Sequence, residues 1–508
     1  MHRQLRYLLI IALVYGVALR FYAISQWKQG LSHDESVSYL CASATEGMYQ
    51  ERIPTYMDTL IQAATIQVLY QRPAQLALTT VASDLVRYDI HPPLYFWALH
   101  AQHTFVGSGI NGGLWLNAFA GLFILGCTYL MARHTLGTAN LALVACAVWY
   151  LSPAVVQIDL EARQYQFMAA CAMASYLLVI RSGQSGMSSM ELIGFTVINT
   201  LGLLSHYYYS FLLVPGISIV LLRHGFRKPL LILLSSLIAS YALFLLLFPE
   251  FLEFIKAYED RAKDPEAERI LMDKMKTIVY ATLAFFTHAH LLRYIFLLLC
   301  LAGSTAVLIR YGRAGMSTFT RASSPSKEVA LLLTWCALFT TGLYLLGVSP
   351  PHAVGEQYFA YFWPLLAIVL VHVARLLLPA RYRLWILTAY MLQLGYAFTT
   401  SVRGSEYLKP VLPAGWYATL KDSDVLVVDD VKRSFLPRAM RDMPGGTPLF
   451  LMKEGRPSVN ASTAVSYVHL DVENRPTAAA FTTWMTAQGF THGEVRVHKH
   501  HELHTYTR

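Results

Sequence analysis

The stretch LLIIALVYGVALRFYA, residues 8–23, is an apolar run that is followed closely by the polar stretch LSHDESVSY, residues 31–39. An apolar run of about 17 to 25 residues is long enough for a helix to cross a bilayer. The first run therefore predicts a transmembrane helix, and we expect it to be retained because no clear small-residue cleavage site follows it. His33, Asp34 and Glu35 stand side by side where this helix leaves the membrane, which makes the exit a candidate site.

The composition of the whole chain is that of an integral membrane protein. Of the 508 residues, 55% are hydrophobic and 14% are charged, and the mean hydropathy is +0.41. About a quarter of the residues are charged in ordinary soluble domains. The net charge of +9 would suggest nucleic acid as the partner of a soluble protein, but much of the Lys and Arg lies in short loops between apolar runs, where it sets topology. The sequence predicts membrane lipid and no nucleic acid as a partner.

Apolar runs of spanning length recur through the first 400 residues and predict about eleven transmembrane helices. The segment 92–105 is short for a span and polar in part, and placing it outside the membrane puts most basic loops on the side of Arg3 and Arg6, as the positive-inside rule requires. We therefore predict that this segment is an interfacial helix. The predicted spans lie near residues 8–25, 113–132, 139–157, 165–180, 189–205, 207–222, 229–248, 291–309, 328–348, 358–374 and 384–400.

The predicted fold is an all-α polytopic membrane protein with a small C-terminal α/β domain. Residues 1–403 form the transmembrane domain, which includes a large first outer loop at about residues 26–112 with interfacial helices. Residues 404–508 form the soluble domain on the outer face. Within it, DVLVVDD at residues 424–430 is typical of a buried strand.

Polar side chains gather at the outer ends of the predicted helices. Ionisable groups at membrane depth are costly and usually line a cavity or a pathway, so we expect a shared cavity on the outer face. Plainer roles remain open, since tyrosines favour membrane interfaces and the head group of a long Arg side chain reaches for water. The polar groups include Arg20, Asp34, Glu35, His91, Tyr95, Asp159, Glu161, Arg163, Tyr165, His206, Gln357 and Tyr358.

Metal binding is a weaker alternative. The carboxylates of Asp159 and Glu161 are ligands of the kind that Mg²⁺ or Mn²⁺ prefers, so these two residues are the metal candidates. The chain has no HExxH or CxxC motif. No cofactor is firmly implied, and a divalent cation stays an open alternative.

Four segments resemble, in this order, those of the C-type glycosyltransferases that use polyprenyl-phosphate sugars. The resemblance covers about the first 410 residues and is nearest to the bacterial relatives of protein O-mannosyltransferases and of the lipid A aminoarabinose transferase. One departure is Gln357, which stands where the family often has an Arg before the Tyr. The four segments are ALRFYAI with LSHDESVSY, DIHPPLYFWALH, LSPAVVQIDLEARQYQFM and GEQYFAYFWPLL.

The resemblance implies the C-type fold and a glycosyltransferase, either a hexosyl- or a pentosyltransferase. Such an enzyme would move a sugar, with inversion of the anomeric configuration, from a polyprenyl-phosphate donor to a hydroxyl or amine of a lipid, glycan or protein acceptor. Asp34 matches the acidic pair of the family and would be the catalytic base, while Glu35 would orient the acceptor or tune Asp34 through like-charge proximity. The phosphate would be contacted by Arg163, in a bidentate manner, or by a basic residue of the region 249–293 such as Arg293.

The other substrate-binding candidates are His91 and Tyr165, as hydrogen-bond partners of sugar or phosphate, together with Tyr95, Glu161, His206, Gln357 and Tyr358. The resemblance also implies a bacterial inner membrane, with the active site and the C-terminus facing the periplasm. Two other classes stay open, namely a flippase or other transporter of lipid-linked sugars and a non-catalytic envelope assembly protein.

Overall fold

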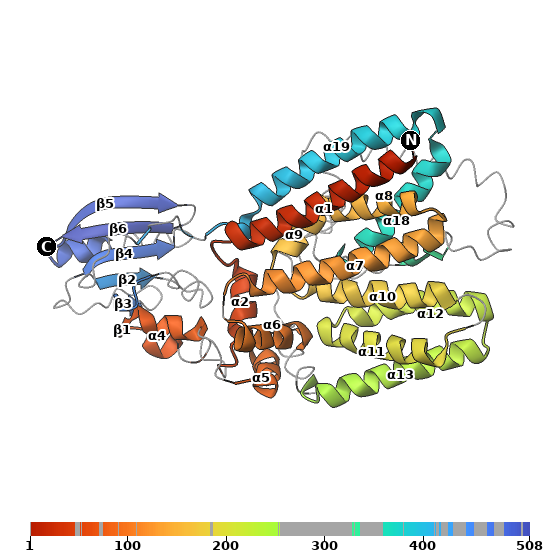
Figure 1. Ribbon diagram of the computed structural model, residues 1–508. Helices are drawn as coiled ribbons and strands as arrows, with labels where there is room; N and C mark the ends of the chain where they lie inside the picture. The colour runs from red at the N-terminus through yellow and green to blue at the C-terminus, as the bar shows by residue number, and fades with distance from the viewer. Residues whose placement is uncertain are drawn as a thin grey trace. The chain divides into compact units, whose positions relative to one another are not determined.

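The computed structural model divides into two compact units (Figure 1). The helical unit contains Met1–Trp27, His91–Tyr95 and Gly113–Glu406, and the mixed unit contains Lys28–Ile90, Phe96–Gly112 and Tyr407–Arg508. The residues that the structure describes are 2–45, 51, 53–70, 75–89, 91–107, 109–182, 186–251, 253, 328–329, 331–335, 359–378, 380–410, 412, 416–417, 425–429, 443–451, 465–471, 482–498 and 501–507.

The helical unit is built from long apolar helices, of which α1, α7 and α13 are each long and apolar enough to cross a membrane. The bent pair α8 and α9 raises this number to four, and α11, α12 and α18 are shorter apolar helices. The described helices are α1 (His2–Gln26), α7 (Gly112–Leu136), α8 (Ala139–Tyr150), α9 (Pro153–Leu160), α10 (Tyr165–Ser182), α11 (Ser189–Ser205), α12 (Tyr209–His224), α13 (Lys228–Leu247), α18 (Phe362–Leu377) and α19 (Ala380–Gly404).

These helices agree with the predicted spans except at residues 139–157, where the structure has two helices, α8 and α9, bent by 60°. The break has a local cause. Pro153 is the first residue of α9, and Ser152 before it is extended, with φ −65° and ψ 136°. Proline cannot donate a backbone hydrogen bond and disfavours a helical conformation of the residue before it. The predicted span 291–309 and most of 328–348 lie outside the described residues, so the count of eleven stays a prediction.

Helices α1 and α7 run in opposite directions. Near the end of α1, the ring of Phe21 packs edge-on against Trp115 near the start of α7, with the centroids 5.1 Å apart. At the opposite end, Arg6 Nε donates to Asn140 Oδ1 at 3.1 Å, just after α7 has ended. The chain therefore leaves the helical unit and re-enters it at the same end. This agrees with the prediction that the segment 92–105 does not cross the membrane.

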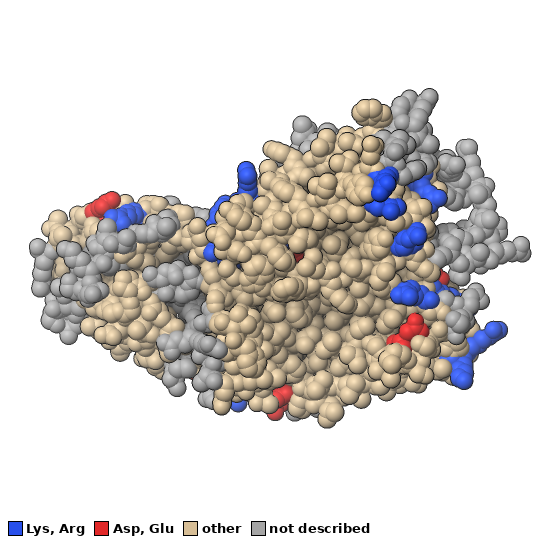
Figure 2. All heavy atoms as spheres, in the orientation of Figure 1, with Lys and Arg blue, Asp and Glu red and all other residues tan. Residues whose placement is uncertain are grey.

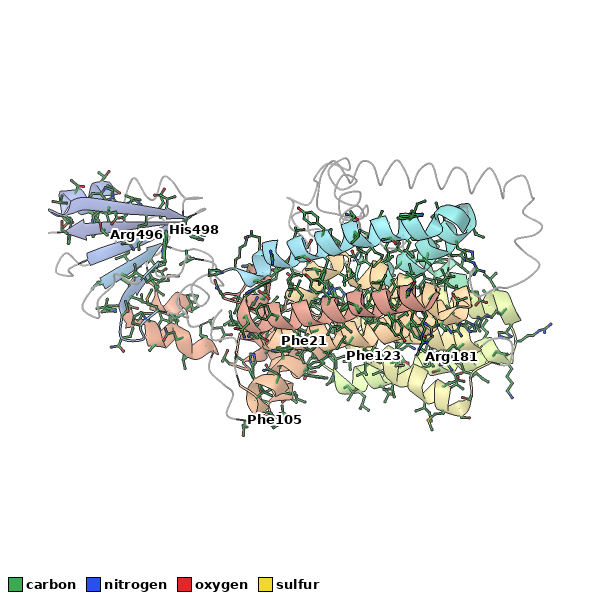
Figure 3. The ribbon with its side chains drawn as sticks, turned by 45° about the horizontal axis from the view of Figure 1, so that its top comes forward. Phe21, Phe105, Phe123, Arg181, Arg496 and His498 are labelled. Carbon is green, nitrogen blue, oxygen red and sulfur yellow. The ribbon has the colours of Figure 1, made fainter. Side chains whose placement is uncertain are left out.

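Basic residues gather at one end of the helices (Figure 2). Arg375 Nη1 donates to the carbonyl of Leu136 at 3.1 Å, and Arg223 Nη1 donates to the carbonyl of Val179 at 2.7 Å. Figure 3 shows Arg181 at this end and Phe21 toward the other. Enrichment of Lys and Arg at one end is the pattern that the positive-inside rule predicts for the cytoplasmic ends of membrane helices.

The mixed unit combines short helices with a six-stranded sheet in the order β1-β3-β2-β4-β6-β5. Strand β2 is parallel to β3 and β4, while the remaining pairs are antiparallel. Figure 3 labels Arg496 and His498 on β5. The elements are α2 (His33–Ala42), η1 (Ile53–Tyr56), β1 (Leu60–Gln62), α4 (Ala63–Gln67), η2 (Val68–Tyr70), α5 (Leu78–Tyr88), α6 (Leu94–Phe105), η6 (Glu406–Leu408), β2 (Val425–Asp429), β3 (Pro448–Leu451), β4 (Val465–Asp471), β5 (Thr491–His498) and β6 (His501–Thr507).

The sheet has a hydrophobic core on one face. It contains the side chains of Val425, Val427, Phe450, Met485, Phe490 and Tyr506. Alternation along β2 places Val425 and Val427 on this face, as expected for a strand. The predicted strand at residues 424–430 is thus confirmed as β2.

One strand of the sheet comes from the first outer loop. Strand β1 pairs antiparallel with β3, with Ile61 opposite Leu449. The backbone N–H of Asp58 donates to Leu451 O at 2.8 Å, and that of Ala63 donates to Thr447 O at 2.9 Å. A strand of three residues is too short to show alternation in a sequence. The structure therefore adds a connection between the first loop and the C-terminal segment that the sequence pattern does not contain.

Candidate active site

Three of the predicted substrate-binding residues lie together in the helical unit. His206 follows the last residue of α11, Tyr165 begins α10, and His91 precedes α6. The ring of His206 lies 5.7 Å from the ring of His91 and 5.5 Å from that of Tyr165, measured between centroids. His91 and His206 are buried, as is Arg163. The charge of Arg163 also acts on His206. His91, Arg163, Tyr165 and His206 are called the His–Arg cluster below, and they come from segments that are far apart in the sequence.

His206 is held as a neutral hydrogen-bond donor. The backbone N–H of Tyr208 donates to His206 Nδ1 at 3.1 Å, so the ring proton resides on Nε2. Burial, with the charges of His91 and Arg163 in addition, lowers the pKa of His206 well below its usual range. Among the described residues, His206 Nε2 is buried and has no hydrogen-bond partner. An N–H group in this position suits an oxygen atom of a bound sugar or phosphate.

Acidification is expected to destabilise the protein partly through His206. Below about pH 6.5 this histidine takes up a proton in the unfolded chain but stays neutral in the folded protein. The stability is therefore full above pH 6.5 and falls, by up to about 1.4 kcal/mol per pH unit, until the pH reaches the lowered pKa of the folded state. In thermal unfolding in detergent at pH 7.5 and pH 5, His206→Gln should lose less stability than wild type.

The matched control for this measurement is His134→Gln, because His134 is exposed at the end of α7. That variant should follow the wild-type pH dependence. An identical acid-induced loss in His206→Gln and wild type would contradict a buried neutral His206.

The loop that carries Arg163 is shaped by the end of α9. Glu161 is extended, with φ −104° and ψ 123°, and its carbonyl accepts hydrogen bonds from the backbone N–H of Arg163 at 2.8 Å and from Asn117 Nδ2. Glu161 is itself buried. Residues 161–164 therefore form a short, backbone-anchored connection, which fixes where the Arg163 side chain begins.

Helix α7 starts against this loop because Gly113 has no side chain. A Cβ atom at Gly113 would lie 2.5 Å from Ala162 Cβ and 2.7 Å from Tyr95 Oη, closer than real contacts allow. Tyr95 is fully buried, packs edge-on against Phe167 at 5.4 Å, and donates from its hydroxyl to Gly113 O at 3.3 Å. Tyr95, which is predicted to bind substrate, thus contacts the start of α7 at Gly113.

Gln164 is a residue that sequence reasoning missed. Its side chain is fully buried, and among the described residues neither its amide oxygen nor its amide nitrogen has a hydrogen-bond partner. A buried amide of this kind offers one acceptor and two donors. Its position between Arg163 and Tyr165 in the sequence was the available signal, but a single Gln in such a segment has no distinctive pattern.

A buried ion pair fastens both ends of this loop. Arg20 Nε lies 2.5 Å from Asp159 Oδ2, and neither side chain is more than 1% exposed. The other carboxylate oxygen of Asp159 accepts a hydrogen bond from Gln166 Nε2. Arg20 also donates from Nη2 to Tyr150 O at 2.5 Å, at the end of α8. Asp159 lies in the last turn of α9, before the loop, and Gln166 lies in the first turn of α10, after it, so the hydrogen bonds of Asp159 hold the two ends of the loop together.

The ion pair of Asp159 with Arg20 involves a residue that was a candidate ligand for a divalent cation. Both carboxylate oxygens of Asp159, one of the two metal candidates, accept hydrogen bonds from Arg20 and Gln166. Within the described ranges, no three His, Cys, Asp or Glu side chains are grouped as a metal-ion site. Gln357 and Tyr358 lie outside the described residues.

The acidic residues Asp34 and Glu35 lie in the mixed unit, in the first turn of α2. Ser32 caps this helix: Glu35 N donates to Ser32 Oγ at 3.2 Å and Ser32 N donates to Glu35 Oε2 at 2.7 Å. Glu35 is fully buried, and each of its carboxylate oxygens lies 2.7 Å from Lys28 Nζ. These contacts give Glu35 a structural role at the start of α2, and its part in orienting the acceptor or tuning Asp34 stays a prediction. Asp34 is half-buried and keeps access to solvent.

Comparisons with known proteins give a matching family and a similar fold. Residues 90–251 match the family described as dolichyl-phosphate-mannose-protein mannosyltransferase, and no curated protein matches significantly. A similar solved structure is ArnT from Cupriavidus metallidurans bound to undecaprenyl phosphate, with 12% identity, a TM-score of 0.54, and coverage of 98% of this chain and 97% of that chain. Its apo state gives 11%, 0.49, 98% and 97%. The oligosaccharyltransferase of Archaeoglobus fulgidus, in complex with Zn and sulfate, gives 13%, 0.48, 96% and 71%.

The resemblance to C-type glycosyltransferases is thereby confirmed. The matched mannosyltransferase domain, residues 90–251, contains the whole His–Arg cluster. The ArnT structure shares the fold of nearly the entire chain. Family domain and fold together support a membrane glycosyltransferase.

Proposed function

We propose that the protein is an inverting glycosyltransferase that takes its sugar from a polyprenyl-phosphate donor. The observation that carries this proposal is the buried His–Arg cluster, His91, Arg163, Tyr165 and His206, within a mannosyltransferase domain. A guanidinium group suits phosphate oxygens, and a neutral imidazole N–H suits a sugar or phosphate oxygen. In this proposal the helical unit binds the donor, and its apolar helices accommodate the lipid tail.

The proposed base is Asp34, on its match to the acidic pair of the family. As the acceptor hydroxyl attacks the anomeric carbon of the sugar, Asp34 takes the hydroxyl proton, the new C–O bond forms, and the bond between the anomeric carbon and the phosphate oxygen breaks. The polyprenyl phosphate leaves with the bonding electrons, and Arg163 offsets its charge. A single displacement of this kind inverts the anomeric configuration.

The distribution of basic residues supports the proposed location. The basic ends of the helices are assigned to the cytoplasm, so the His–Arg cluster, near the opposite ends, acts on the outer face. We propose the inner membrane of a bacterium, with the reaction on its periplasmic side. The acceptor is a hydroxyl or amine of a lipid, a glycan or a protein.

The test is a transfer assay with purified protein in liposomes. Radiolabelled polyprenyl-phosphate hexoses and pentoses are offered with a membrane extract as acceptor, with and without EDTA. Labelled product with inverted anomeric configuration supports the proposal, and loss of that product with EDTA, restored by Mg²⁺ or Mn²⁺, would establish the divalent cation. Movement of labelled lipid across the bilayer without product would indicate a flippase instead.

Substitution of Arg163 is expected to weaken donor binding. A hydrogen bond to a charged group contributes about 1.5–3 kcal/mol, so Arg163→Met should raise the KM for the donor by roughly 10- to 150-fold. Arg163→Lys keeps the charge but loses the fork of donors and should have a smaller effect. The control is Arg181→Met, because Arg181 is exposed and lies at the far end of α10, the helix that follows Arg163. A donor KM that is the same in Arg163→Met and wild type would contradict the role of Arg163.

A further inference from the structure

Lys28 lies in a buried hydrogen-bonded junction of the mixed unit that the proposed reaction does not explain. Its ammonium group donates to both carboxylate oxygens of Glu35 at 2.7 Å and to the carbonyl of Tyr407 at 2.6 Å. The side chains of Lys28 and Glu35 are both 0% exposed. An ammonium group has three N–H donors, so these three acceptors saturate it.

The same junction has a second tie in the backbone. Gln29 N donates to Leu408 O at 2.9 Å, next to the carbonyl that Lys28 contacts. The residues that lead into α2 are therefore bound to η6 (Glu406–Leu408), where the C-terminal segment begins. Further along the first loop, β1 is bound to β3 of the C-terminal sheet. The C-terminal segment thus holds the first loop at two separate places.

Asp34 is placed by this junction. It is the residue before Glu35, whose carboxylate is fixed by Lys28 and by Ser32 N at 2.7 Å. The backbone of Asp34 is therefore tied on one side to the cap of α2 and on the other to a saturated ion pair. Its own half-buried side chain starts from a fixed point.

We propose that Lys28 is a positioning residue for Asp34, and that the C-terminal segment serves the reaction by anchoring Lys28 through Tyr407. This inference rests on the proposed function of Asp34 as the base. It assigns the C-terminal segment a role in presenting the base, where no role followed from its sequence. Lys28 itself does not touch the reacting atoms.

The carboxylate of Glu35 is a buried charge whose partner is Lys28. Removing the Lys28 ammonium leaves the Glu35 carboxylate buried without its partner, which is strongly unfavourable. The start of α2 then relaxes toward solvent, and Asp34 moves with it. A misplacement of about 1 Å at a reacting group costs about 100-fold in rate. Donor binding, which we assign to the His–Arg cluster, should remain.

The experiment compares full-length wild type, Lys28→Met, Lys28→Arg and Lys409→Met in liposomes. Lys409 is exposed and lies two residues after Tyr407, so its substitution removes one lysine charge from the C-terminal segment and leaves the buried junction intact. For each protein, the Kd of the polyprenyl-phosphate sugar and the number of donor-binding sites are measured first. Turnover in the transfer assay is then expressed per donor-binding site, which removes any loss that is due to unfolded protein.

We expect Lys28→Met to bind the donor with a Kd within about twofold of wild type and to turn over about 100-fold more slowly. Lys28→Arg, which restores the charge, should recover much of the rate, and Lys409→Met should match wild type. Equal turnover per site in Lys28→Met and wild type would overturn the inference. If Lys28→Met does not fold, Glu35→Gln, which removes the negative charge and keeps one oxygen that can accept the capping hydrogen bond from Ser32 N, is judged by the same criterion.

The two proposals fail in different ways. A wild-type protein that binds donor and transfers no sugar would overturn the proposed function, and the inference with it. Equal rates of sugar transfer in Asp34→Asn and wild type would show that Asp34 is not the base, and Lys28 would then have no base to position. An active wild type with an inactive Asp34→Asn and a fully active Lys28→Met would overturn the positioning role alone.

Discussion

Asp34→Asn is expected to lower the turnover of sugar transfer by about two to four orders of magnitude, the usual contribution of a positioned general base. Asparagine has nearly the same shape as aspartate and cannot accept a proton at neutral pH. Asp34 is half-buried at the start of α2. The helix should tolerate the change, because Ser32 and Glu35 supply the capping hydrogen bonds. The measurement is initial rate in the liposome assay at saturating donor.

The matched control is Asp58→Asn. Asp58 belongs to the same unit and is exposed, and its φ of 60° is a conformation that asparagine adopts readily. This control should transfer sugar at the wild-type rate. Wild-type turnover in Asp34→Asn, with normal donor binding, would show that the proton goes to another group.

Arg20→Met is expected to have the largest effect on stability, a loss of about 3–5 kcal/mol in the free energy of unfolding. Removing one partner of a buried ion pair leaves the other charge uncompensated. Here Asp159 would remain fully buried, and Tyr150 O would lose the hydrogen bond from Arg20. The measurement is unfolding of the purified protein in mixed detergent micelles with increasing denaturing detergent.

Two further variants separate lost charge from lost packing. Arg20→Met combined with Asp159→Leu removes both charges and should recover most of the stability, because apolar replacement of a whole buried pair is often neutral. Arg6→Met, on the same helix and exposed, should change stability by about 0.5 kcal/mol or less. A single variant Arg20→Met as stable as Arg6→Met would contradict a buried pair.

The course of the helices could be predicted from the sequence, because an apolar run of spanning length has one stable form in a membrane. The spans near 189–205 and 113–132 correspond closely to α11 and α7. Pro153 also indicated the break between α8 and α9. The break was not predicted, because the apolar run in the sequence continues across this proline. Strand β1, with three residues, was beyond reach, since its partner is set by tertiary pairing.

The candidate site was predictable where a motif carried it. His91, Arg163, Tyr165 and His206 were chosen from short segments, and the structure brings them together. The partners of charged groups were not predictable. Arg20 and Asp159 are 139 residues apart, and nothing in either segment identifies the other. The buried position of Glu35 likewise depends on Lys28 and Tyr407, which only the folded chain brings together.

The junction at Lys28 also sets an order of assembly. Lys28 and Tyr407 are separated by 379 residues, and ribosomes add about 5 to 20 residues per second. The first loop therefore emerges roughly 20 to 80 seconds before the segment that completes its ion pair and its sheet. During this interval Glu35 lacks Tyr407 beside its lysine partner and β3 has not yet been made. The last part of the chain to be synthesised thus decides when the first loop becomes native, and a nascent chain arrested before Tyr407 would be recognisable to proteases by that unfinished loop.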